Sequence, residues 1–164
     1  MTSTEQIATH FRAVYFGGNW TSVNVRDTLA GITWQQATTR LPGLHTIATL
    51  VFHLNYYVSP VLKVLQGAPL EASDASSFQA RPLPAPTDWQ KLVDKALTEA
   101  EAMAAAIEKL PEVKLTEDFT DPKYGSYYHN LHGIIEHTHY HLGQIVLLKK
   151  MLTEPIQGEL ISDN

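Results

Sequence analysis

The stretch "HGIIEHTHYHLGQIVLLKK", residues 132–150, places four of the chain's eight histidines within ten residues and continues into an aliphatic run. In this stretch and beside it, residues that would share one helical face recur at steps of three or four: Tyr127, Leu131, Ile134, Thr138, His141, Ile145, Leu148 and Leu152. This period is that of an α-helix, which we expect from about Tyr124 to Leu152. His137, His139 and His141 alternate as they would in a strand, but the longer 3.6-residue period around them favours the helix.

Three other segments carry helical periodicity, separated by residues that break helices. Ser3 and Gln6 form a candidate capping box for a helix that "FGGN", residues 16–19, interrupts. Helical spacing resumes over residues 23–29, and a second box at Thr33 and Gln36 predicts a short turn. Apolar residues recur again from Leu44 to Leu65, before Gly67 provides a stop signal.

The stretch "GAPLEASDASSFQARPLPAP", residues 67–86, contains four prolines and predicts an extended connection rather than a packed element. A box at Thr87 and Gln90 then introduces a helix whose apolar stripe runs from Trp89 to Ile107, closed by Pro111. The sequence therefore predicts an all-α fold, a four-helix bundle with a long crossover connection between its second and third helices. We expect residues 1–164 to form a single domain with a frayed tail over residues 154–164.

The composition excludes several classes of function. The chain has 12 basic and 17 acidic residues, a net charge of −5, and no basic run that would suit a nucleic acid. It contains no cysteine, so any thiol chemistry must use a thiol supplied by a substrate. The N-terminal residues read as neither a signal peptide nor a membrane span, so we expect a cytoplasmic protein with no membrane partner.

His137 and His141 are the first candidates for a metal site. Positions four apart on a helix lie on one face with Cβ atoms roughly 6 Å apart, so both imidazoles can point to one place. In the bundle interior, each unpaired ring would carry a desolvation cost of about 1–3 kcal/mol. A divalent metal would satisfy both, with His53 from the second helix as the third ligand. The alternative is three core histidines hydrogen-bonded to backbone or tyrosine groups.

The remaining polar and aromatic candidates have weaker signals. Helical geometry turns His139 about 200° from His137, toward solvent or a subunit partner. Glu136 is expected to be a solvated charge. His10 and His129 are expected on the surface, and His45 and His132 lie either near the site or only near helix ends. Four aromatic residues are candidates for a pocket wall, although core packing is their commoner role: Trp20, Tyr56, Tyr57 and Tyr140.

Two segments resemble the DinB-like superfamily: "PGLHTIATLVFH", residues 42–53, and "LHGIIEHTHYHLGQIVLLKK", residues 131–150. "GGNW" and "LAGITWQQA" near the start extend the resemblance over most of the chain. The resemblance implies a four-helix bundle, often a homodimer, with nickel or zinc held by three histidines at the positions of His53, His137 and His141. Many members carry a small or basic residue where this chain has Leu142, which bears on the substrate class.

The resemblance also implies a choice of functions. Some members resemble transferases that use low-molecular-weight thiols such as bacillithiol or mycothiol, and others resemble isomerases. We expect a metal-dependent transferase that joins such a thiol to a small electrophile. The alternatives are a dimeric metal-binding stress or sequestration protein without catalysis, and a metal-free helical protein that binds a partner through exposed apolar faces.

Overall fold

The computed structural model describes residues 1–153, whose regular structure is helical, without a strand in that range. The α-helices are α1 (Ser3–Phe16), α2 (Val25–Leu29), α3 (Trp34–Thr38), α4 (Ile47–Leu65), α5 (Pro86–Glu108) and α6 (Tyr127–Thr153). Short 3₁₀ turns lie at Asp74–Ser76, Glu112–Thr116 and Pro122–Tyr124. The predicted all-α class is confirmed, whereas the predicted frayed tail lies outside the described residues.

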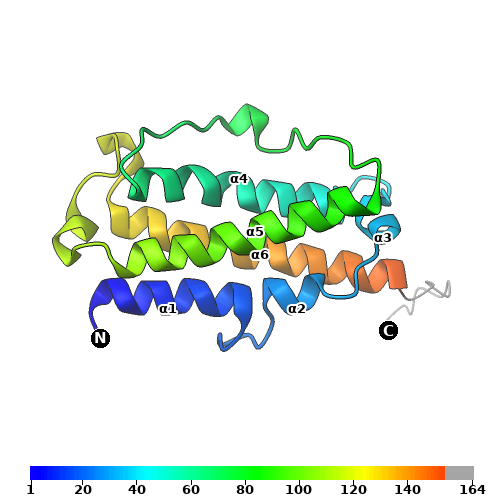
Figure 1. The fold of residues 1–164 in the computed structure, drawn as a ribbon, viewed down its shortest axis with the longest axis horizontal. Helices are drawn as coiled ribbons and strands as arrows, with labels where there is room; N and C mark the ends of the chain where they lie inside the picture. The colour runs from blue at the N-terminus through cyan, green and yellow to red at the C-terminus, as the bar shows by residue number, and fades with distance from the viewer. Residues whose placement is uncertain (154–164) are drawn as a thin grey trace, which may run out of the picture.

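Four long helices, α1, α4, α5 and α6, lie side by side (Figure 1). Both α4 and α1 contact α5 and α6, while the short helices α2 and α3 pack at one end. The segment 66–85 leaves the end of α4 and runs back along its length before α5 begins (Figure 1). As a result, α4 and α5 point in the same direction, and this segment lies over α4 instead of projecting into solvent.

The predicted apolar stripes form the core. On α6, the inward face consists of the buried residues Leu131, Ile134, Thr138, His141, Ile145 and Leu148. Met103 and Ile107 of α5 and Phe11 of α1 are fully buried on the facing helices. Each buried aliphatic or aromatic side chain stabilises the fold by about 1.5–3 kcal/mol relative to exposure. The helical period read from the sequence is therefore confirmed on all four long helices.

Two predicted helix starts were wrong. The first helix is capped by Thr2, whose extended backbone lets its hydroxyl accept from Glu5 N–H, so Ser3 already lies inside the helix. The helix predicted to start with a box at Thr87 begins instead at Pro86, without a side-chain cap. Proline suits the first helical position because its missing N–H would have no helical partner there.

The other helix ends either agree with the predicted ends or differ from them by two or three residues. Thr46 caps α4, so this helix starts after Leu44. Gly125, with φ of 73°, separates the 3₁₀ turn at Pro122–Tyr124 from the start of α6. The predicted box at Thr33 is confirmed, and Gly67, with φ of 92°, ends α4 as expected.

None of the helices within residues 1–153 combines the length and the apolar character needed to cross a membrane.

Candidate metal centre

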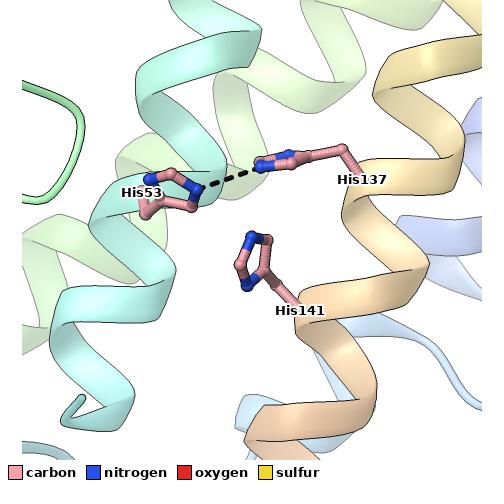
Figure 2. A group of neighbouring side chains, drawn as sticks. All are labelled: His53, His137 and His141. Atoms are coloured by element: carbon pink, nitrogen blue, oxygen red, sulfur yellow. Dashed lines mark hydrogen bonds between the residues drawn. The ribbon is translucent and has the colours of Figure 1, made fainter. Parts of the chain in front are cut away.

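Three histidines from two helices meet near the middle of the fold. His53 projects from α4, and His137 and His141 project from successive turns of α6 toward it (Figure 2). One ring nitrogen of each lies within 4.8 Å of the others. The closest approach joins Nε2 of His53 and Nε2 of His137 at 3.0 Å. The structure thus brings together the three side chains that the sequence selected.

The ring of His53 is oriented by the segment between α4 and α5. Its Nδ1–H donates to the carbonyl oxygen of Ser77 at 3.0 Å. A carbonyl can only accept, so a neutral His53 carries its proton on Nδ1 and leaves the Nε2 lone pair free. In the contact with His137, the donor is therefore Nε2–H of His137. A cation at this point would replace that proton.

The ring of His141 is oriented from its own helix. Its Nδ1 lies 2.7 Å from Oε1 of Gln144, one turn further along α6. With the amide oxygen accepting, the Nε2 lone pair of His141 is also left free. Two of the three imidazoles are thus fixed through Nδ1, the arrangement that outer hydrogen-bond partners impose on metal-binding histidines. The alternative of ordinary core hydrogen bonds accounts for these Nδ1 atoms and for Nε2 of His53, which accepts from His137, but it supplies no partner within residues 1–153 for Nε2 of His141.

Aromatic rings enclose the cluster. Phe78 stacks on His53 with ring centroids 3.7 Å apart and planes 10° from parallel, and it also stacks on His45 at 4.5 Å and meets His141 edge-on at 6.4 Å. Tyr57 meets His53 and His137 edge-on at 5.2 and 4.8 Å. Water is displaced from these ring faces, which lowers the local polarity around the nitrogens.

The segment that carries Phe78 is anchored on α4. The hydroxyl of Tyr57 donates to Oδ1 of Asp74 at 2.9 Å. The hydroxyl of Tyr56 donates to the carbonyl oxygen of Ser73 and accepts from the same residue's N–H, both at 2.9 Å. These bonds hold the segment over the histidines, so Phe78 is positioned by α4 itself.

The pKa values of two rings follow from burial. Burial, together with the smaller effects of the neighbouring charges of His141 and His53, lowers the pKa of His137 to about 4. Burial also lowers the pKa of His53, against the opposing effect of its bond to Ser77. Both rings are therefore neutral at pH 7, which is the form that binds a metal.

The donor set fits a divalent transition metal. Two imidazole nitrogens bound at about 2.0–2.1 Å to one ion lie roughly 3 Å apart, which is the separation of the closest pair here. Within residues 1–153, no carboxylate or further histidine joins the cluster. Three neutral protein ligands leave room for a substrate or water, and imidazole suits zinc, nickel, copper and iron.

The other titratable residues considered from the sequence lie outside the cluster of three histidines. Glu136, His10 and His129 are exposed, as predicted. His45 lies beside the site through Phe78, whereas His132 lines a separate pocket with His10. The half-buried His139 has its ring centroid 6.3 Å from that of His10 and does not join the cluster.

Two of the four aromatic residues proposed as a pocket wall, Tyr57 and Tyr140, contact the histidine cluster. Tyr57 touches two of the three histidines, and Tyr140 meets His141 edge-on at 4.8 Å while remaining 66% exposed. Tyr56 contributes only by holding Ser73. Trp20 was a wrong candidate, because its side chain is 100% exposed on the loop after α1.

Sequence reasoning missed three contributors. Ser77 and Phe78 lie in the segment taken as an extended, unpacked connection, yet Ser77 is 2% exposed and Phe78 covers His53. A single phenylalanine in a polar, proline-rich stretch was the available signal. Gln144 stands three residues after His141, a spacing at which side chains meet on a helix, and could have been found from that spacing.

A family model described as the DinB superfamily matches residues 19–145, which include all three histidines. No curated protein and no solved structure matches the chain. The match covers well over half of the sequence and confirms the resemblance.

Proposed function

The chain belongs to the DinB superfamily, and from its three converging imidazoles we propose a metal-dependent transferase that joins a low-molecular-weight thiol to a small electrophile. His53, His137 and His141 hold the divalent ion in this proposal, with nickel and zinc as the favoured elements. The four long helices then correspond to the four-helix bundle of the family, and the segment 66–85 corresponds to its crossover connection.

The observation that carries the proposal is the orientation of the rings. Nε2 of His53 and His141 is left unprotonated by the bonds that Ser77 and Gln144 make to Nδ1. A divalent ion held by these three histidines would supply Lewis acidity, which would lower the pKa of a substrate thiol toward neutral pH. A chain without cysteine has no thiol of its own to compete for this role.

The reaction is a substitution at the electrophile. The sulfur lone pair forms a new S–C bond, the bond from that carbon to the leaving group breaks, and the leaving group departs with its electron pair. The thiol proton ends on the leaving group or in solvent. The chain's part is to keep its rings neutral and oriented and to exclude water through Phe78 and Tyr57, which cover the ring faces.

The first test measures the metal. Wild-type protein and the variants His53→Ala, His137→Ala and His141→Ala are loaded with nickel or zinc, desalted and analysed for bound metal. About one ion per chain is expected in the wild type and much less in each variant. His129→Ala, which removes an exposed histidine of α6, is the matched control. An unchanged metal content in the three variants removes the proposal.

The second test separates transfer from simple metal binding. Metal-loaded protein is incubated with bacillithiol, mycothiol or glutathione and a fluorogenic haloalkyl electrophile. Product formation above the uncatalysed rate, lost in His137→Ala, supports the transferase. If the metal binds stoichiometrically, chelation lowers the melting temperature, and no thiol yields product, the non-catalytic metal-binding alternative replaces it.

The quaternary state belongs to the same proposal. We propose a homodimer, as the family resemblance implies. Light scattering coupled to size-exclusion chromatography measures the mass in solution directly, and a mass near 18.3 kDa at micromolar concentration refutes the dimer.

A further inference from the structure

A cavity separate from the histidine cluster lies where the segment 66–85 meets α4. It has a volume of about 810 Å³, within the range of small-molecule sites. Residues 79–83 contribute to its lining, together with residues of α4 that include Phe52 and Tyr56. None of the three clustered histidines lines it. The cavity is therefore distinct from the candidate metal centre, although the segment 66–85 contributes residues to both.

The charge in the cavity lining is positive only. Arg81 is its single charged side chain, and the lining includes no carboxylate. Arg81 is exposed and takes part in none of the ion pairs found within residues 1–153. Arginine presents a planar fork of donors that suits a carboxylate or another oxyanion. The cavity thus has a cationic group without a protein counter-charge.

A hydroxyl proton is also available in the lining. Thr46 Oγ1 accepts from the backbone N–H of Thr49 and lies 2.9 Å from Thr49 Oγ1. The two hydroxyls have two protons but share one contact, so one O–H remains to donate to a ligand. The rest of the wall is largely apolar, with Phe52, Leu83 and Leu92 on three different elements. The lining therefore combines an apolar body with donors for an anionic group.

We propose that this cavity binds a small organic anion with an apolar body, such as a medium-chain or aryl carboxylate. Arg81 pairs with the carboxylate, and the apolar part lies between the segment 79–83 and α4. Binding at this site does not depend on a metal and does not rest on the proposed transferase.

The probe is decanoate, measured by calorimetry with metal-free protein in the presence of a chelator. Removing metal prevents a carboxylate from coordinating at the histidines, and His137→Ala provides the same safeguard. Binding of one decanoate per chain is expected in both proteins, with decanol binding more weakly because it lacks the charge.

Three variants locate the site. Arg81→Gln, on an exposed side chain, is expected to weaken decanoate binding by about tenfold or more and to leave decanol unchanged. Ala80→Trp fills the cavity from the segment and is expected to abolish both, with the melting temperature checking that the protein is folded. Lys150→Gln removes one exposed positive charge from α6 and is expected to change nothing.

The results that overturn the proposal are equally definite. They are the absence of saturable decanoate binding to wild-type protein up to millimolar concentration, equal binding of decanoate and decanol, or an unchanged affinity in Arg81→Gln. Loss of metal binding in the histidine variants, with decanoate binding retained, separates this site from the proposed metal centre.

Discussion

Replacing His137 by alanine should remove most of the stabilisation that a metal gives to this protein. The ring supplies one of three converging nitrogens, and its Nε2 forms the closest pair with His53 at 3.0 Å. Zinc binding to four-ligand sites is worth about 10–16 kcal/mol, or about 3 kcal/mol for each ligand. Loss of one ligand should therefore weaken binding by roughly 100-fold.

This weakening converts into a change of melting temperature. At a free metal concentration 100 times the wild-type dissociation constant, binding stabilises the wild type by about 2.7 kcal/mol. At the same concentration, His137→Ala is half-saturated and gains only about 0.4 kcal/mol. For a chain of this size, 1 kcal/mol shifts the melting temperature by about 2–4 °C. The metal-induced shifts should then be about 5–10 °C for the wild type and about 1 °C for the variant.

The assay is differential scanning calorimetry of metal-free protein with and without zinc or nickel. His129→Ala, which lacks an exposed histidine on the same helix, should retain the full wild-type shift. The reasoning is refuted if His137→Ala keeps the wild-type shift, or if the wild type shows none.

Three further outcomes are expected. Gln144→Leu should lower metal affinity by about 10–100-fold in a chelator competition, because His141 loses its Nδ1 partner, whereas Gln144→Glu should retain it. Equal affinity in Gln144→Leu contradicts this. The metal-free protein should lose stability in urea as the pH falls from 7 toward 4, because burial holds the pKa of His137 at about 4 and the unfolded chain binds more protons. The pH slope should be smaller in His137→Ala, and equal slopes speak against the burial argument. Lys149→Gln should cost about 1–2 kcal/mol in chemical unfolding, because its ammonium donates to two carbonyls at the end of α2. Lys150→Gln should change stability by less than about 0.5 kcal/mol, and a similar loss in both variants argues against a specific contact.

Much of the fold was predictable because helical periodicity is a local property. Residues spaced three or four apart share a face whatever they pack against, so the stripes of α4, α5 and α6 could be read directly. Helix starts were harder to predict. Thr2, Ser3, Pro86 and Thr87 all suit a helix start, and the choice between adjacent candidates depends on backbone angles that neighbouring segments impose.

In the candidate site, too, the features set by local spacing were predictable and those set by distant contacts were not. His137 and His141 were predictable as a pair because one helix sets their spacing, and His53 because it lies near the inward stripe of α4. The partner of His53 was not predictable. Ser77 contributes a backbone carbonyl, which every residue has, and Phe78 reaches the ring only because the segment 66–85 runs back along α4.

The sequence by itself determined the all-helical class, the inward faces of the long helices and the three histidines that meet. Each of these depends on residue spacing within one helix or on residue type. The tertiary structure alone decided the helix directions, the tautomers that Ser77 and Gln144 impose, and the roof that Phe78 forms. Those features arise from contacts between residues that lie far apart in the chain or from hydrogen bonds whose geometry the order of residues does not encode.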